Sequence, residues 1–462
     1  METNQNRFLT YSHFFDSKIW ILCAVEYIKM LYLNKQFKSM KIITTGDWHI
    51  GNLFHGNDRL HEHEHFLKWL HATIVDQQPD ALLVAGDVFD NGNPSASAQK
   101  AYYDFLAGIT QACPQLMVII TAGNHDSASR LEAPRPLLAI NNVEIRGNIK
   151  RRWVSDSTGG GHWVFDFDDL MIPVEDKEGN KAVVIAVPYL RNDVIQKDSY
   201  SDGVNEILRN LTTAAHEKHP GATVIMMAHM YARGADIAQD DASEKIVIGG
   251  QEEVSMSGWK DHPDYLTCGH IHKRQHIWNT DWARYSGSVL PMSFAEKDYH
   301  HGVDMVSFNK NGHPVISFLE YEPQHRLRIL PEDDKVLTPK QMEKLIDTEL
   351  RPRKEGKLSE NFDYLLLKIK VEKFGNDEMA ALNEHLAGMD AVVCKLKKIA
   401  DSIDLSTIVG QQAITSIDDI LDRDPMDTLK ETFTIRHNSE MTEHQEKMLR
   451  EIINNINSQT EE

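Results

Sequence analysis

Five short segments of the sequence place acidic, amide or imidazole side chains directly after an apolar run. Imidazole mixed with carboxylate and amide donors favours Mn, Fe or Zn over Ca or Mg, and ligand type alone does not choose among these three. Seven such donors exceed the positions of one tetrahedral zinc ion, so they indicate two ions. The predicted metal ligands are Asp47, His49, Asp87, Asn124, His229, His270 and His272.

Asp87 is predicted to bridge the two ions, because one carboxylate can offer an oxygen to each and this residue lies between the two ligand groups in the sequence. Two divalent ions about 3.5–4 Å apart activate a water and stabilise the attacking and leaving oxygens of an in-line displacement at phosphorus. The predicted chemistry is therefore phosphoester hydrolysis. The two groups are Asp47, His49 and His272 for one ion, and Asn124, His229 and His270 for the other.

His125 follows Asn124 and is not needed as a ligand. We expect it to stabilise charge on the phosphoryl oxygens or to protonate the leaving alkoxide, a contribution of about 10²- to 10⁴-fold. Asp126 is predicted to orient a histidine ligand from behind. Other histidines are interpreted as structural: the HEHEH segment at 61–65 as the solvated face of a helix, and His300 and His301 as loop residues.

The apolar runs that precede the ligands are typical of strands buried on both faces. Helical spacing between the first two runs, and again after Pro94, indicates an α/β fold. The carboxyl ends of parallel strands form a crevice, so the ligands are expected to converge there. Further strands in 142–190 and 285–321 predict a mixed sheet system doubled into a sandwich. The five buried runs are 41–45, 81–85, 116–121, 223–228 and 265–268.

The rest of the chain predicts further units. Residues 322–339 are polar, contain three prolines and are interpreted as a linker, followed by a small α/β unit and then by helices. Met40 directly precedes the first strand, so the residues before it are expected to be a non-native extension from a wrong start-codon choice, with a membrane anchor as the alternative. The predicted units are 1–39 (extension), 40–325 (catalytic domain), 326–404 (linker and cap) and 405–462 (C-terminal helices).

Composition limits the function classes further. The net charge is −20, which argues against a freestanding nucleic-acid binder with a broad basic face. The four cysteines are far apart and form no CxxC pair, which fits a reducing cytoplasm better than a disulfide framework. A non-catalytic scaffold would be expected to have lost ligands, whereas all seven positions are filled.

Taken in order, the motifs DxH, GDxxD, GNHD, H and GHxH resemble those of the calcineurin-like metallophosphoesterases, over residues 40 to about 300. GDVFDNGNPS at 86–95, NHDS at 124–127 and GSVLPMSFAEK at 287–297 look more narrowly like the nuclease subunits of a bacterial DNA-repair complex. The resemblance implies a double-sheet β-sandwich flanked by helices, with a small α/β cap domain and C-terminal helices. A phosphatase or a cyclic-nucleotide phosphodiesterase of the same fold is the alternative.

The resemblance also implies a manganese-type enzyme that cleaves DNA as a double-strand exonuclease and a single-strand endonuclease. It implies a coiled-coil ATPase partner and a homodimer within a heterotetramer, without membrane attachment. His125 corresponds to the family's catalytic histidine, whereas Asp90 stands where archaeal and eukaryotic relatives have a second one, so a catalytic role for Asp90 is doubtful. Apolar stripes in 405–462 are expected to dock on the partner, with folding back on their own domain as the alternative.

Overall fold

The computed structural model describes residues 40–399 apart from 157–159, 196–198, 237–252, 256–258, 260, 278–279, 310–311, 334 and 371–375. The predicted extension at 1–39 and the predicted helices in 405–462 lie outside the described residues. In the part of the chain that is described, no helix is both long enough and apolar enough to cross a membrane.

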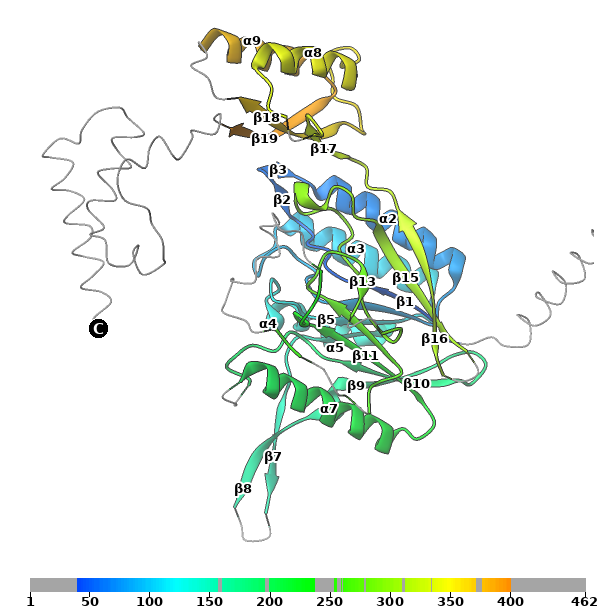
Figure 1. The fold of residues 1–462 in the computed structure, drawn as a ribbon. Coiled ribbons are helices and arrows are strands. Elements are labelled where there is room, and N and C mark those ends of the chain that lie inside the picture. The colour runs from blue at the N-terminus through cyan, green and yellow to red at the C-terminus, as the bar shows by residue number, and fades with distance from the viewer. Residues whose placement is uncertain are drawn as a thin grey trace, which may run out of the picture. The chain divides into compact units, whose positions relative to one another are not determined.

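Two six-stranded mixed sheets form the main body (Figure 1). The first has the order β16-β15-β1-β4-β5-β6, and the second β13-β14-β12-β11-β10-β9. The first sheet contains β1 (Lys41–Thr45), β4 (Ala81–Ala85), β5 (Met117–Thr121), β6 (Val143–Arg146), β15 (His301–Phe308) and β16 (Pro314–Tyr321). The second contains β9 (Met171–Glu175), β10 (Lys181–Ala186), β11 (Thr223–His229), β12 (Tyr265–Gly269), β13 (Gln275–His276) and β14 (Ala283–Tyr285).

Apolar side chains fill the space between the two sheets, including Leu83 from β4 and Val184 from β10. Helices α2 (Leu60–Gln77) and α3 (Ala96–Ala112) cover the outer face of the first sheet, and α7 (Tyr200–Lys218) covers the second. Strands β1, β4 and β5 of the first sheet are therefore buried on both faces, which explains their continuous apolar sequences. The predicted fold class, a double-sheet α/β sandwich, is confirmed.

Parallel pairing brings together the ends that carry the predicted ligands. β1, β4, β5 and β6 pair in parallel, and so do β10, β11, β12 and β14. Close packing at these ends depends on glycine. A Cβ on Gly86 would lie 2.2 Å from Nδ1 of His229, and one on Gly123 would lie 2.1 Å from Oδ1 of Asp87.

A three-stranded sheet forms the small α/β unit that was expected after the linker. It has the order β17-β18-β19, and helices α8 and α9 pack on it. The linker interpretation was wrong for the middle of 322–339, where a short strand lies between two prolines. Pro339 opens α8 behind a capping box made by Thr338 and Gln341. The elements are β17 (Leu327–Leu330), α8 (Pro339–Glu349), β18 (Asp363–Lys370), α9 (Asn376–Ala387) and β19 (Ala391–Ile399).

Helix α2 joins the main body to this unit through buried polar contacts. Arg59 and Glu62 are both fully buried and form an ion pair with Nε to Oε1 at 2.7 Å. The Tyr364 hydroxyl on β18 donates to Glu62 Oε1 at 3.3 Å. The solvated-face interpretation of HEHEH was therefore wrong for Glu62 and His63, which are both fully buried.

Candidate metal centre

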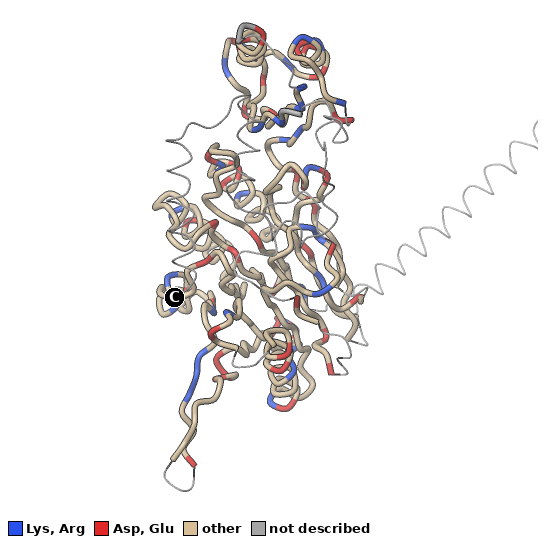
Figure 2. The backbone as a smooth tube through the Cα atoms, turned by 60° about the vertical axis from the view of Figure 1, so that its left-hand side comes forward, with Lys and Arg blue, Asp and Glu red and all other residues tan. Residues whose placement is uncertain are grey.

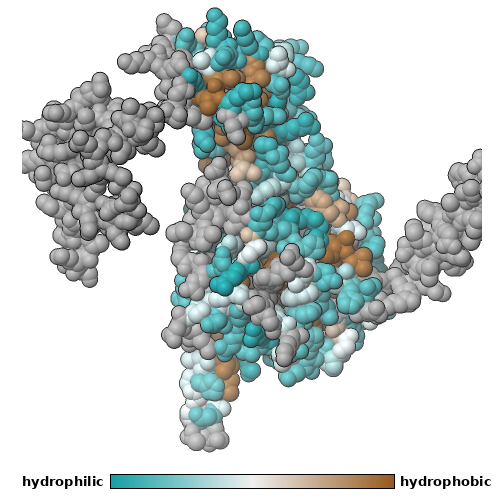
Figure 3. Space-filling view, in the orientation of Figure 1, coloured by the Kyte–Doolittle hydropathy of each residue, from teal (hydrophilic) through white to brown (hydrophobic). Residues whose placement is uncertain are grey.

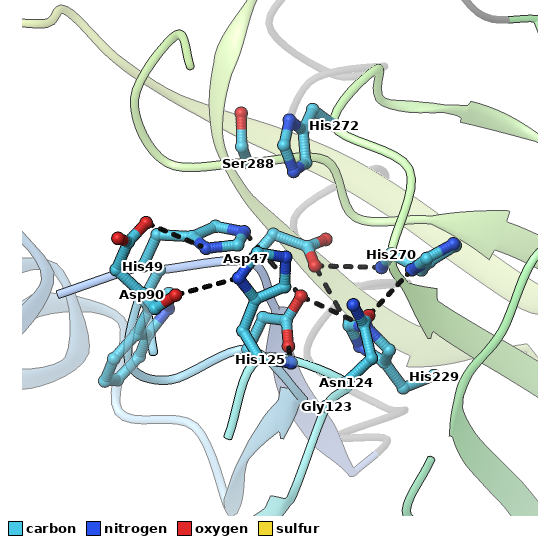
Figure 4. Close-up of polar contacts among 12 residues, drawn as sticks. Asp47, His49, Asp90, Gly123, Asn124, His125, His229, His270, His272 and Ser288 are labelled. Atoms are coloured by element: carbon cyan, nitrogen blue, oxygen red, sulfur yellow. Dashed lines mark hydrogen bonds and ion pairs between the residues drawn. The ribbon is translucent and has the colours of Figure 1, made fainter. Parts of the chain in front are cut away.

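The seven predicted ligands converge at the carboxyl ends of parallel strands in both sheets, and Figure 4 labels all of them except Asp87. From the first sheet, β1 leads to Asp47 and His49, β4 to Asp87 and β5 to Asn124. From the second sheet, His229 ends β11, and β12 leads to His270 and His272. The structure therefore brings together every residue of the predicted set.

The first donor group consists of Asp47, His49 and His272, whose ligand atoms lie within 4.8 Å of one another. Oδ2 of Asp47 and Nε2 of His49 are buried and have no hydrogen-bond partner. Leaving a buried polar atom unsatisfied costs about 1–3 kcal/mol. A divalent cation between these atoms would satisfy both, so this group fits a metal ion.

The second donor group is formed by Asn124, His229 and His270. Nδ1 of His229 donates to the carbonyl of Ala85 at 2.9 Å, so in the neutral ring Nε2 carries a lone pair. This Nε2 faces Oδ1 of Asn124 at 2.9 Å and Oδ2 of Asp87 at 3.3 Å, and Nδ1 of His270 lies 3.0 Å from the same Asn124 oxygen. Ring nitrogens and side-chain oxygens converging in this way offer lone pairs to a shared cation, so this group also fits a metal ion.

The electrostatic environment of His229 also favours a positive charge at this position. Burial opposes protonation of this histidine, but the carboxylates of Asp87 and Asp47 outweigh it and raise its pKa to about 9. The site thus attracts positive charge, which a divalent metal ion supplies more fully than a proton does.

Asp87 lies between the two groups. Its Oδ2 is 3.7 Å from Nε2 of His49 and 3.3 Å from Nε2 of His229, and its Oδ1 accepts the backbone N–H of His125 at 2.8 Å. Burial alone would raise the pKa of Asp87, but His229, followed by His49 and His125, holds it well below its usual value. A permanently ionised carboxylate beside a ligand of each group has the geometry that a bridge requires.

His125 is oriented through its ring. Nδ1 donates to the backbone carbonyl of Asp90 at 2.8 Å, which leaves Nε2 free to act on a substrate. The carboxylate of Asp90 accepts a hydrogen bond from Asn52 at 2.8 Å and lies 3.7 Å from Nδ1 of His49. The structure therefore gives Asp90 a positioning contact with His125 through its main chain.

Asp126 does not orient a histidine, so that expectation was wrong. Its carboxylate accepts backbone N–H groups from Gly123, Val88 and Phe89 at 2.9, 3.1 and 3.0 Å. Burial, with the charge of Asp87, raises the pKa of Asp126 to about 6. The residue joins the loop after β4 to the loop after β5, and these loops carry Asp87 and Asn124.

Sequence reasoning missed Glu296, which is fully buried in the short 3-10 helix η2 (Phe294–Glu296). Nδ1 of His272 donates to Oε1 of Glu296 at 3.0 Å, and the Met292 N–H donates to Oε2 at 2.8 Å. A carboxylate behind a ligating histidine fixes its tautomer and raises its basicity. The available signal was a single acidic residue within the otherwise uncharged segment PMSFAE at 291–296.

Backbone strain marks the same site. Asp47, His49, Asp87 and His270 have φ values of 51°, 46°, 47° and 96°, in the left-handed region that side chains other than glycine disfavour. Such conformations cost about 1–3 kcal/mol each and cluster at functional sites, where the surrounding structure enforces them. The packing at the strand ends thus holds these ligands in place at an energetic cost.

The family model of the calcineurin-like phosphoesterases matches residues 40–274, and the chain belongs to this class. The SbcD subunit of the SbcCD nuclease from Rhodobacter capsulatus is 34% identical over 363 residues, covering 76% of this chain and 85% of the relative. The proteins of the same name from Escherichia coli and Bacillus subtilis are 31% and 30% identical, each over 58% of this chain and over 65% and 66% of their own lengths. Within its class, the chain belongs to the SbcD family of nuclease subunits, as the sequence motifs predicted.

Proposed function

We propose that this chain hydrolyses DNA phosphodiester bonds with two divalent metal ions, manganese being the expected metal and iron or zinc the alternatives. In this proposal it acts in the cytoplasm as a double-strand exonuclease and a single-strand endonuclease in DNA repair and recombination, together with an SbcC-type coiled-coil ATPase. The observation that carries the proposal is the pair of donor groups on either side of Asp87.

The contacts support a role for each residue. Asp47, His49 and His272 would hold one ion, Asn124, His229 and His270 would hold the other, and Asp87 would serve both. When bound, the ions supply an activated water and charge stabilisation at phosphorus. His125, held at Nδ1 by the Asp90 carbonyl, presents Nε2–H in its protonated form to a phosphoryl oxygen or to the leaving alkoxide.

The acidic balance of the chain supports the need for a partner. DNA affinity rests largely on neutralising phosphates, and a net charge of −20 opposes this. Figure 2 shows acidic and basic residues interspersed along the described backbone. Local basic clusters occur at 150–152, 351–354 and 395–398, the last two in or beside the small α/β unit, which is proposed to steer DNA. Pull-down with a protein truncated after about residue 405 tests partner docking, and full retention of the ATPase would exclude it.

Two exposed apolar side chains support a homodimer. Leu137 on α5 (Arg135–Leu138) and Ile140 on η1 (Ala139–Asn141) are 72% and 78% exposed. Burial of such side chains contributes about 1.5–3 kcal/mol each, so a second copy is a favourable cover. Changing both to Glu is expected to yield monomers in sedimentation velocity. The matched control is Val315→Glu, which alters a 50% exposed side chain on β16 and should leave the dimer intact.

The central experiment compares the wild type with Asp87→Asn, using labelled double- and single-stranded DNA with added Mn²⁺ and metal analysis of the purified protein. The wild type is expected to bind two ions per chain and cleave both DNAs, and the variant to lose most of both properties. Asp298→Asn, a change at an 80% exposed carboxylate, is the control. Undiminished cleavage by Asp87→Asn would remove the bridge from the proposal, and faster turnover of small aryl phosphates than of DNA would favour a phosphatase.

A further inference from the structure

A β-hairpin outside the metal centre carries two exposed tryptophans. Strands β7 (Arg151–Ser155) and β8 (Gly161–Phe165) pair with each other and project from the body in Figure 1. Trp153 and Trp163 are directly opposite in the register, 51% and 63% exposed, with ring centroids 5.5 Å apart. An indole is a large apolar surface, so two adjacent exposed indoles indicate a binding site for a ligand or a partner.

The same face of the hairpin continues as an aromatic and cationic strip. Arg151 and Phe165 are the next pair on this face, and the Arg151 guanidinium carbon lies 5.0 Å from the centroid of the Phe165 ring. Phe165 in turn stacks with Phe167 at 6.3 Å between centroids and 15° between planes. Hydrophobic residues also show on the surface of this hairpin in Figure 3. The strip thus runs from the indole pair to the body of the protein.

The charge of the hairpin is opposite to that of the chain. Residues 151–165 contain Arg151, Arg152 and one acidic residue, Asp156, so their net charge is 2 − 1 = +1 with His neutral, whereas the whole chain has a net charge of −20. The basic residues show as a blue stretch on the projecting arm in Figure 2. Arg152 lies on the other face, 3.9 Å from Asp166, so a polyanion that most of the surface repels is attracted to this element mainly through Arg151.

The root of the hairpin is fixed beside the catalytic loop. Lys150 forms ion pairs at 3.0 Å with Glu132 of α4 (Ala128–Glu132) and with Asp169 of α6 (Phe167–Leu170). Helix α4 begins three residues after His125. The element that follows the catalytic histidine in the chain therefore also anchors the aromatic strip.

We propose that the Trp153–Trp163 strip binds unpaired bases of the DNA substrate, with Arg151, which lies on the same face, neutralising an adjoining phosphate. The identity of the ligand rests on the proposed function. Aromatic side chains stack on every base, because each base has a π-face, and one stacked base contributes a factor of about 5 to 150 in affinity. The hairpin thus holds single-stranded DNA, or a frayed duplex end, without reading its sequence.

The test measures binding of the full chain, in EDTA to prevent cleavage, to a fluorescent single-stranded oligonucleotide of about 30 nucleotides, long enough for several stacking sites. Replacing Trp153 and Trp163 by Ala is expected to weaken binding at least about tenfold, and replacing both by Phe to restore most of it. Replacing Arg151 by Gln is expected to reduce the slope of log affinity against log salt by about 0.7, whereas Arg152→Gln, on the other face, should leave the slope unchanged. Val315→Ala, at another exposed apolar side chain, is the control and should bind as the wild type does.

Each outcome decides the proposal separately from the nuclease assignment. Turnover of a small aryl phosphate diester with Mn²⁺ should be equal in the wild type and the Trp variants, which verifies their folding. Unchanged DNA binding in the double Ala variant overturns the proposal, and loss of ATPase partner binding with DNA binding unchanged identifies the hairpin as a protein-docking element instead. Hairpin-dependent binding by a wild type that cleaves no DNA would uphold this inference and refute the proposed function.

Discussion

Glu296→Gln is expected to weaken binding of the metal ion for which His272 is a proposed ligand. In the wild type Oε1 accepts a hydrogen bond from His272 Nδ1 at 3.0 Å, and Oε2 accepts one from the Met292 N–H at 2.8 Å. A Gln side chain has one acceptor oxygen for these two donors, so its NH₂ group must face either the imidazole N–H or the backbone N–H. The imidazole thereby loses the negative partner that orients it.

The expected size follows from the role of such carboxylates. Mutation of a group behind a metal ligand typically lowers metal affinity by about 10- to 100-fold, which corresponds to about 1.4–2.8 kcal/mol. Isothermal titration of the apo protein with Mn²⁺ measures this directly, and one of the two binding events should weaken while the other stays near its wild-type affinity.

The chain supplies a matched control on its surface. His300 Nδ1 and Glu320 Oε1 form the same kind of pair at 2.7 Å, but both side chains are mostly exposed. Glu320→Gln should leave both Mn²⁺ affinities unchanged. If Glu296→Gln also binds two ions with wild-type affinity, the buried carboxylate does not support His272 and the reasoning is refuted.

Three further changes have defined outcomes. His125→Ala should keep both ions by metal analysis but lose about 10²- to 10⁴-fold in DNA turnover, and an empty site would contradict its assignment as a non-ligand. Gly123→Ala places a Cβ 2.1 Å from Oδ1 of Asp87 and should abolish tight Mn²⁺ binding in titration; normal affinity would show that the loop can yield. Burial lowers the pKa of His301 from 6.5 to about 4, so the unfolded chain takes up a proton at a higher pH than the folded chain does. The contribution of His301 to the free energy of unfolding therefore falls by about 2 kcal/mol from pH 7 to pH 5. In urea unfolding, the free energy of unfolding of His301→Gln should fall by that much less over this pH range than that of the wild type. An equal pH dependence in His301→Gln and in His300→Gln, the control at an exposed site, would refute this.

The sequence was sufficient for features encoded locally. The strands at 41–45 and 81–85 have the predicted bounds, because runs of apolar residues buried on both faces need no knowledge of the rest of the chain. The ligands follow such strands directly, so parallel topology alone was enough to bring Asp47 and Asp87 together.

Features that depend on long-range packing were missed. Glu296 and His272 are 24 residues apart, and no periodicity links a loop carboxylate to an imidazole at that distance. The sequence around Glu62 indicates a polar, solvent-exposed helix surface. The structure instead places Arg59 and Tyr364 beside Glu62, and these contacts make its burial possible. His301 was expected in a loop, but it begins β15, is buried, and donates through Nδ1 to the Ser288 carbonyl.

Each of the two donor groups draws residues from both sheets, which has a mechanical consequence. Asp47 and Asn124 extend from the first sheet, whereas His229 and His272 extend from the second. An ion bound by either group would therefore be coordinated by residues of both sheets, and its binding energy would oppose separation of the two sheets. At a free concentration 100 times its dissociation constant, one such ion adds about 2.7 kcal/mol to folding stability. Removal of the metal ions by a chelator should thus lower the melting temperature of the protein as well as abolish its catalytic activity.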